Sequence, residues 1–337
     1  MTILVVFILF LLLLILPFLP GIIELVRKND AEPLFIHMDY AKDPRYFGKS
    51  FKHILRQAAA GLTVGPEIRD LQLSKQEKVQ ITESLVVSAN REIDHVLYIQ
   101  GNLITGDHAY LIKGAYATGD VSLGVNNTIH VLVADGNISV ASGTKFGRWL
   151  DADGTIAVGE NCNLGICASS GDKLYLDQNC IFRRLFGMPI ITGNTQAMAL
   201  SALPKAVFLP LTPGFVRKKD REIPAGTVID KNIVFIGDVN IGRDSVLMGD
   251  VKSYGNVIIE EDVTIHGSVF ADGDISVGSG TKIGGNLFSQ NAVYISKQVV
   301  ISRPDVIKSV VGKKIVSIEQ NVTIYGYVTT EGDGITI

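Results

Sequence analysis

The 337-residue chain has few of the residues from which cross-links and metal sites are built. It contains 3 cysteines, Cys162, Cys167 and Cys180, which lie within one short stretch. Their odd number and the absence of spaced partner residues argue against a disulfide framework and against a zinc site. Two of the three fall where small residues recur in the sequence repeat described below. We therefore expect buried free thiols, which fit a reducing compartment.

The sequence also lacks a basic excess and the common catalytic motifs. It has 31 Lys+Arg against 34 Asp+Glu, which argues against a general nucleic-acid binder. There is no P-loop, GxSxG motif, HExxH motif or cluster of metal ligands, so we expect no cofactor and no metal. His130 and His266 fall at matching places of a duplicated segment, which favours a structural role over that of a unique catalytic base. The remaining histidines, His37, His53, His95 and His108, lie in no catalytic motif.

A short repeat dominates the second half of the chain. Residues 231–302 divide into four rows of 18 residues, and each row divides into three hexads. The third and fifth residues of a hexad are mostly apolar, and they point to the same face of a strand. This pattern predicts an all-β fold, a three-sided β-helix with about 18 residues per coil, and places Ile259 and Ile265 in its core. Six hexads begin with glycine, where we expect corners at φ values that other residues avoid: Gly237, Gly249, Gly255, Gly267, Gly273 and Gly285.

The first half carries a related repeat, so we expect two β-helical lobes. The segment DGNISVASGTKFG at 135–147 matches DGDISVGSGTKIG at 272–284, which indicates duplication of a whole lobe. Proline residues interrupt the repeat between the lobes. The predicted parts are a transmembrane anchor at 1–26, a juxtamembrane segment at 27–84, a first lobe at 85–187, a proline-rich insert at 188–222 and a second lobe at 223–337. About five coils are expected in each lobe.

The N-terminus predicts a membrane anchor. Residues 3–23 carry no charge over 21 positions, enough for a helix to cross a bilayer core of about 30 Å. Pro17 and Pro20 are expected to kink or end this helix. A cleaved signal peptide is the alternative, but no basic segment precedes the apolar run and no small-residue cleavage site follows it. Positive charge begins after the run, at Arg27 and Lys28, so we expect the bulk of the chain to be cytoplasmic.

A second helix is expected over DPRYFGKSFKHILRQAAAG, with Asp43 as its N-cap and Gly61 as its stop. Its apolar residues recur at helical spacing and its charged residues are all basic between Pro44 and Ala60. One interpretation is a helix that lies on an anionic membrane surface. The other is a helix that covers the open end of the solenoid core. The expected membrane-surface residues are Arg45, Phe47, Lys49, Phe51, Lys52 and Arg56.

Several hexads follow the pattern apolar-Gly-x-polar-small-x-apolar, among them LGVNNTI, VGENCNL, IGRDSVL and VGSGTKI. Such hexads are found in hexapeptide-repeat acyltransferases and in bactofilins, the polymer-forming bacterial cytoskeletal proteins. The glycine-led corners, such as GDV at 119 and at 249, make the chain resemble bactofilins more closely. The resemblance covers about 85–187 and 223–337. The second lobe, the membrane span and the insert depart from the bactofilin pattern.

The resemblance implies a non-catalytic scaffold that self-associates at the bacterial inner membrane and recruits envelope or membrane proteins. The chain ends on YVTTEGDGITI with no terminal helix, so we expect an open C-terminal coil that needs a partner. Val328 and Ile335 are the residues expected to mediate self-association there. A hexapeptide-repeat acyltransferase and a carbohydrate-handling β-helix of the cell envelope remain the alternative functions.

Overall fold

The structure is a computed structural model that describes residues 2–19, 43–60, 69–72, 77–193, 206–210, 214–218 and 221–337. The chain divides into two compact units, Met1–Asp43 and Pro44–Ile337. The second unit contains both lobes, and its strands form one continuously hydrogen-bonded sheet over the described residues. It is a β-solenoid of about 13 turns, somewhat more than the ten coils expected from the sequence.

The N-terminal unit contains helix α1 (Thr2–Ile15), which is uncharged along its 14 residues. A 3-10 helix, η1 (Leu16–Phe18), follows directly, and Pro17 lies within it. This agrees with the expectation that Pro17 ends the regular helix. Among the described residues, no helix has the combination of length and hydropathy that a bilayer crossing requires. The expected anchor runs to residue 26 and therefore extends beyond residue 19, outside the described residues.

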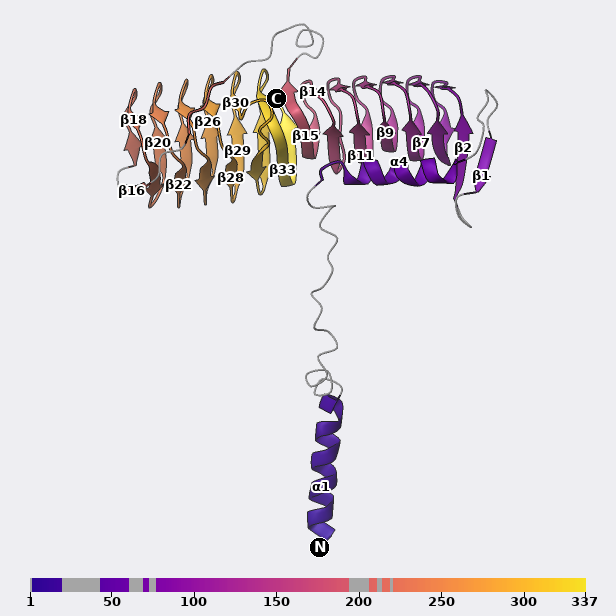
Figure 1. The fold of residues 1–337 in the computed structure, drawn as a ribbon, viewed down its shortest axis with the longest axis horizontal. Helices are drawn as coiled ribbons and strands as arrows, with labels where there is room; N and C mark the ends of the chain where they lie inside the picture. The colour runs from indigo at the N-terminus through magenta and orange to yellow at the C-terminus, as the bar shows by residue number, and fades with distance from the viewer. Residues whose placement is uncertain are drawn as a thin grey trace. The chain divides into compact units, whose positions relative to one another are not determined.

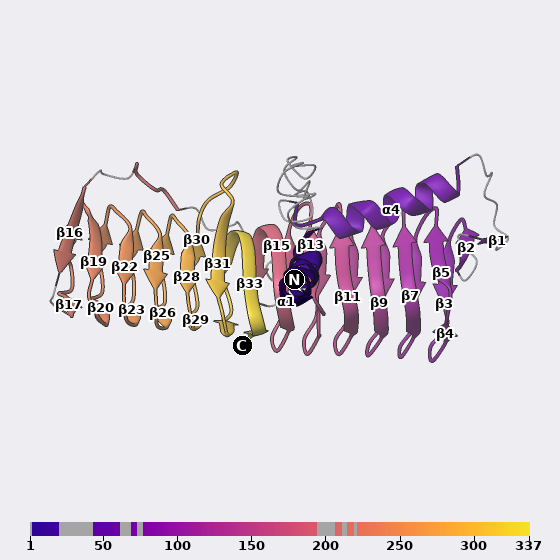
Figure 2. The same ribbon diagram turned by 90° about the horizontal axis from the view of Figure 1, so that it is seen from below.

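The solenoid strands follow one another around three sides, and each pairs in parallel with the strand one turn away (Figures 1 and 2). An exception at the start is β1, which pairs antiparallel with β2. The first lobe contains β1 (Arg69–Gln72), β2 (Lys78–Thr82), β3 (Leu85–Val87), β4 (Glu92–Ile93), β5 (Val96–Ile99), β6 (Leu103–Thr105), β7 (Tyr110–Ala117), β8 (Val121–Leu123), β9 (Thr128–Ala134), β10 (Ile138–Val140), β11 (Lys145–Ala152), β12 (Ile156–Val158), β13 (Cys167–Ser170), β14 (Leu174–Leu176) and β15 (Ile181–Thr192).

The second lobe repeats this arrangement after the insert. Its first strand precedes the predicted lobe boundary at residue 223, within the segment interpreted as proline-rich insert. The strands are β16 (Phe215–Lys218), β17 (Glu222–Ile223), β18 (Val228–Ile229), β19 (Asn232–Phe235), β20 (Val239–Ile241), β21 (Val246–Leu247), β22 (Val251–Ser253), β23 (Val257–Ile259), β24 (Thr264–Ile265), β25 (Val269–Ala271), β26 (Ile275–Val277), β27 (Lys282–Ile283), β28 (Leu287–Ser289), β29 (Ala292–Ile295), β30 (Val300–Ile301), β31 (Lys308–Gly312), β32 (Ile315–Ile318) and β33 (Thr323–Thr336).

The register read from the hexads is confirmed. Ile259 and Ile265 are buried, and they stack on Val277 and Ile283 of the next turn. The polar exceptions to the apolar pattern are buried as well, and they bond to the corners. Ser253 and Ser289, for example, donate hydrogen bonds from Oγ to the carbonyl oxygens of Gly237 and Gly273. Small hydroxyl side chains therefore satisfy backbone groups inside the core, where an unpaired polar group is costly.

The prediction that the six corner glycines adopt φ values avoided by other residues is wrong. None of the six glycines has a positive φ. Five of them are required instead by the close stacking of turns; a Cβ on Gly255, for example, would lie 2.6 Å from the backbone nitrogen of Asp238. A Cβ on the sixth, Gly237, would meet nothing within 4 Å. Positive φ occurs at a different corner, occupied mostly by Asn and Asp, which tolerate the left-handed conformation. Examples are Asn126, with φ of 56°, and Asp262, with φ of 57°.

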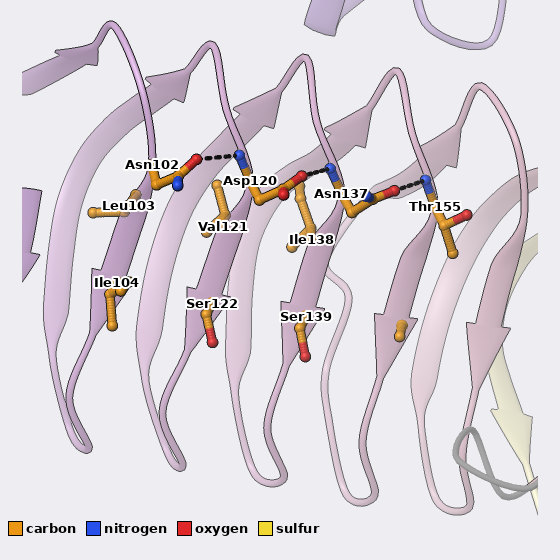
Figure 3. Close-up of a pocket in the computed structure, with 11 residues that line it drawn as sticks. Asn102, Leu103, Ile104, Asp120, Val121, Ser122, Asn137, Ile138, Ser139 and Thr155 are labelled. Carbon is orange, nitrogen blue, oxygen red and sulfur yellow. Dashed lines mark hydrogen bonds between the residues drawn. The ribbon is translucent and has the colours of Figure 1, made fainter. Parts of the chain in front are cut away.

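The polar residue after each corner glycine forms a ladder along the solenoid axis (Figure 3). Oδ1 of Asn102 accepts the backbone N–H of Asp120, Oδ1 of Asp120 accepts that of Asn137, and Oδ1 of Asn137 accepts that of Thr155. A second ladder runs from Asn232 through the corners of the other lobe. The Gly-Asn and Gly-Asp pairs thus have a structural explanation: glycine permits the approach, and the side chain caps the next turn.

Helix α4 (Tyr46–Ala58) lies along the side of the first lobe, across β7, β9 and β11 (Figure 2). The helix expected over 43–61 is therefore present, but it begins later. Its N-cap is Arg45 instead of Asp43, and no side chain caps it. The expected stop at Gly61 lies outside the described residues. Because the helix lies along a side face, it does not cover an open end of the core, which was the second interpretation of the sequence.

The two lobes are joined at their C-terminal turns. Strand β15 ends the first lobe and β33 ends the second, and the two pair antiparallel from Ile181↔Ile335 to Ile191↔Thr323 (Figure 1). Apart from β1 with β2 and an isolated bridge between Arg303 and Val306, the other strand pairings over the described residues are parallel. The lobes therefore point in opposite directions, and the first turn of each lobe lies at an outer end of the solenoid.

Candidate functional site

The junction between the lobes contains two matched sets of contacts. The backbone N–H of Cys180 donates to Oγ1 of Thr336, whose hydroxyl donates to the carbonyl oxygen of Asp177. In the other lobe, the N–H of Val322 donates to Oγ1 of Thr192, which in turn donates to the carbonyl oxygen of Glu319. Each lobe thus supplies one threonine to the last turn of the other. This approximate two-fold arrangement agrees with duplication of an ancestral lobe.

Two residues expected to mediate self-association lie within this junction. Val328 is fully buried and pairs with Leu185, while Ile335 pairs with Ile181. The expectation of an open C-terminal coil is therefore wrong, because the first lobe covers it. Self-association of the chain stays a prediction, but these two side chains are already engaged within one molecule. The sequence repeat could not reveal this, since it specifies stacking between neighbouring turns and not between the ends of lobes.

The basic residues of α4 meet acidic residues on the side of the first lobe. The Arg45 guanidinium pairs with both carboxylate oxygens of Asp151 at 2.8 and 2.9 Å and also contacts Asp153. The Lys52 ammonium lies 2.7 Å from Asp153 and 3.2 Å from Asp135. Both basic side chains are about nine-tenths buried and have two acidic partners each. The Arg45–Asp151 pair is desolvated, whereas Asp153 is 41% exposed.

The pairs shift several pKa values. Burial acts to lower the pKa of Arg45, but hydrogen bonds and charge interactions with Asp151 and Asp153 outweigh it, and the net shift is upward. Burial acts to raise the pKa of Asp153, but hydrogen bonds from Lys52 and Arg45 lower it overall. Burial and the hydrogen bond to Asp135 raise the pKa of Tyr116. The shifts of Arg45 and Asp153 both favour the charged forms of these two groups.

The apolar residues of α4 also pack on the lobe. Phe47 stacks on Trp149 with ring centroids 4.6 Å apart, and Phe51 lies against Gly114, where a Cβ would meet its ring. Leu55 is buried among outward-facing residues of the strands. Of the six expected membrane-surface residues, Arg45, Phe47, Phe51, Lys52 and Arg56 thus contact the solenoid, and Lys49 lies on the same helix. Their membrane-surface role stays a prediction.

The outer ends of the two lobes differ. In the first lobe, the core positions of β2 are Gln80 and Thr82, which are polar, and β1 pairs along its edge. In the second lobe, the corresponding positions are apolar, since Val216, Ile223 and Ile229 stack on core residues of the next turn. We call this first turn, formed by β16, β17 and β18, the outer coil. The first turn of the first lobe thus carries polar residues on its β2 side and the apolar Leu85, Val87 and Ile93 on its β3 and β4 sides, whereas the outer coil has apolar core positions on all three sides.

The outer coil exposes large apolar side chains. Phe215 is 72% exposed, Val228 is 70% exposed and the inward-facing Val216 is 37% exposed. Its three strands each pair with one neighbouring strand among the described residues. This end was not predicted from the sequence because β16 falls in the segment interpreted as a proline-rich insert. The strand has only four residues, two apolar and two basic, which is too short a pattern to identify it.

Two histidines and two hollows of the first lobe are the remaining candidates for chemistry. His95 Nδ1 lies 3.1 Å from Asp94, and its buried Nε2 has no partner among the described residues. The surrounding hollow of about 400 Å³ is lined by charged and amide side chains, without a hydroxyl or thiol nucleophile. His108 is a corner residue with φ of 56°. A larger, shallow hollow of about 600 Å³ lies over the ladder shown in Figure 3. Its one carboxylate, Asp120, already accepts a hydrogen bond from the backbone N–H of Asn137.

The cysteines are unpaired, as expected. Cys162 and Cys180 are buried on successive turns, and Cys167 is partly buried. Burial and the Asp151 carboxylate raise the pKa of the Cys167 thiol to about 12. No group of His, Cys, Asp and Glu among the described residues has the arrangement of a metal site. Cys162 and Cys180 therefore serve as packing groups in the core, whereas Cys167 is in register with Trp149 on the outward side.

His266 holds a short segment of the insert against the second lobe. Its Nδ1 accepts the backbone N–H of Leu209 at 2.8 Å, and Phe208 packs edge-on against its ring. Burial lowers the pKa of His266 below its ordinary value. The matching residue His130 is exposed, so the duplicated histidines have diverged in environment. His266 therefore has a structural role, as its place in the repeat predicted.

We expect this contact to open as the pH falls. Because the pKa of His266 is lowered in the folded state, the unfolded state binds more protons, so the contact is fully stabilising above about pH 6.5 and is lost as the pH falls below it. Replacing His266 with alanine should weaken the contact by about 1 kcal/mol and remove its pH dependence. Hydrogen exchange at the Leu209 amide measures both effects, with His130→Ala as the matched control. A protection factor at Leu209, corrected for the intrinsic pH dependence of amide exchange, that does not change with pH in the unaltered protein would contradict this assignment.

Comparisons with known proteins identify no relative: no family model, no curated protein and no solved structure matches the chain. The class that the structure defines is a two-lobed β-solenoid with ~18-residue coils. Its function therefore has to be argued from its own surfaces.

Proposed function

We propose that the chain is a membrane-anchored, bactofilin-like scaffold protein that self-associates and organises partners at the bacterial inner membrane, without catalysis. The observation that carries this proposal is the contrast between the two ends of the solenoid. The outer coil of the second lobe has apolar core positions on all three sides and no covering strand among the described residues, whereas at the end of the first lobe the β2 side carries Gln80 and Thr82 and pairs with the antiparallel strand β1. The uncharged N-terminal run supports the anchor, and the positive charge after it supports a cytoplasmic location of the lobes.

A second copy of the chain is the partner that best fits the outer coil. Within one chain, two turns of this solenoid already join end to end through antiparallel pairing of β15 with β33. The same geometry applied to two outer coils gives an isologous contact about a two-fold axis. Phe215, Val216 and Val228 would then be removed from water, and the unpaired strand edges would be satisfied.

This arrangement predicts a closed dimer instead of a filament. At the opposite end of each chain, the β2 side has polar core positions and its edge is already paired with β1, so we expect growth to stop after one contact. Two chains joined in this way would form a solenoid of roughly twice the single length with two anchors, which suits a protein that spaces partners along a membrane surface. In contrast, an open polymer would require both ends to be equally adhesive.

The full-length chain in detergent is expected to sediment as a dimer in analytical ultracentrifugation. Replacing Phe215 and Val228 with lysine should return it to a monomer, because four charges would face one another across the two-fold axis. The matched control is Val86→Lys at the other end, where the side chain is also 72% exposed, and it should leave the dimer intact. A monomer at high micromolar concentration would overturn the proposed self-association, and so would loss of the dimer in the Val86 control.

A further inference from the structure

The side of the solenoid that α4 covers continues across the junction into the second lobe. The outward face of β11 adjoins β13, then β15, and antiparallel pairing carries it on to β33, β31 and β28 (Figure 2). On the first lobe, α4 lies over this surface. On the second lobe, no helix of the described residues covers it. We call the outward surface of β25, β28, β31, β33 and the start of β15 the bare face.

Apolar side chains form a row along the bare face. Phe270 is in register with Phe288 on the next strand, and Phe288 is in register with Val311. The row continues through Thr329 to Arg184. Phe270 is 36% exposed, and Phe288 and Val311 are half-buried. This composition resembles the surface beneath α4, where Trp149, Val131 and Tyr116 pack against the helix.

The bare face carries basic residues, whereas the surface beneath α4 on the first lobe carries acidic ones. A hollow of about 580 Å³ lies at the junction, and it is lined by Arg183, Arg184 and Lys313 around an apolar floor of Ile166, Phe288 and Val311. Glu331 also lines it, so the cations outnumber the single carboxylate. None of the three cations has a carboxylate partner within the part of the chain that the structure describes. On the first lobe, by contrast, Asp135, Asp151 and Asp153 form ion pairs with the basic residues of α4.

We propose that the bare face binds an acidic amphipathic helix of a partner protein, in the way that the first lobe binds α4. The row from Phe270 to Arg184 crosses five strands, or about 19 Å at a strand spacing of about 4.8 Å. A helix of 13 residues, the length of α4, extends about 19.5 Å. The partner helix would pack apolar residues on Phe270, Phe288 and Val311 and direct carboxylates to the three cations. The basic α4 of a second copy is excluded by its charge.

A charge-reversed version of α4 is a direct probe of this site. The probe is a fluorescent, helix-stapled peptide of residues 43–60 with Arg45→Glu, Lys49→Glu, Lys52→Glu and Arg56→Glu, and the unchanged peptide is its comparison. We expect the reversed peptide to bind the full-length chain in fluorescence anisotropy at least tenfold more tightly than the unchanged peptide. Binding should weaken as salt is added. Equal binding of the two peptides would overturn the proposal.

Substitutions in the full-length chain test whether the reversed peptide binds at the bare face. Arg184→Glu together with Lys313→Glu should weaken binding of the reversed peptide at least tenfold, whereas Lys282→Glu, an exposed cation on β27, should not change it. Phe215→Lys in the outer coil should also leave it unchanged, which separates this site from self-association. If the two cations instead control binding to phosphatidylglycerol vesicles and the peptide does not bind, the face contacts lipid and the proposal is wrong.

Discussion

Replacing Val328 with lysine is expected to unfold the junction between the lobes. Val328 is fully buried, and its partner Leu185 is 1% exposed, so the ammonium group would lie in a dry contact without a carboxylate. Burial of an unpaired charge costs about 3–5 kcal/mol, a large fraction of the stability of most domains. We therefore expect a markedly lower urea midpoint for the full-length chain, measured by circular dichroism. If Val328 lined an open end for a second chain, the same substitution would change the oligomeric state and leave the stability intact.

Ile258→Lys is the matched control for this experiment. It introduces the same change in the same lobe, but Ile258 is 51% exposed on the outward side of β23. Its effect on stability should be within about 0.5 kcal/mol. Equal urea midpoints for the two variants would show that β33 does not pair with β15 in solution. A monomeric, fully stable Val328→Lys protein would restore an open C-terminal coil as the site of self-association.

The turns of the solenoid were predictable from the sequence because each turn repeats the same local requirements. Positions two apart share a face, and the hexad pattern placed Ile259 and Ile265 inside correctly. The cause of the glycine corners was not predictable in this way. A glycine such as Gly255 is consistent with either a positive φ or a close approach, and the close approach depends on Asp238, one turn earlier.

The contacts between distant parts of the chain were not predictable from the repeat. Arg45 and Asp151 form an ion pair although they are 106 positions apart in the sequence. Neither residue lies in a motif from which the other could be predicted. The run of basic residues in α4 is equally compatible with an anionic membrane and with acidic corners of a lobe. Likewise, the last turns of the two lobes carry no signal that they face each other. A repeat specifies its neighbour in sequence, whereas these contacts are set by the path of the whole chain.

The second large effect is expected at the ion pairs that hold α4. The Asp151 side chain is 2% exposed, and its partners are the Arg45 guanidinium and the hydroxyl of Ser169, which donates at 2.7 Å. Gly48 passes so close to this carboxylate that a Cβ there would meet it. Removal of the arginine therefore leaves a buried carboxylate with one hydroxyl partner, and neither water nor a shift of the helix can easily replace the lost charge.

Arg45→Met is expected to cost about 3 kcal/mol and to release the first turns of α4, because breaking one partner of a buried pair leaves an uncompensated charge. Hydrogen exchange of residues 46–58 and urea unfolding measure the two effects. Asp151→Asn added to Arg45→Met should recover part of the loss, since the neutral amide tolerates burial without a cation. Arg56→Met is the control, because that side chain is 51% exposed and should contribute less than about 1 kcal/mol. If both substitutions cost the same, α4 is held by Phe47, Phe51 and Leu55 alone.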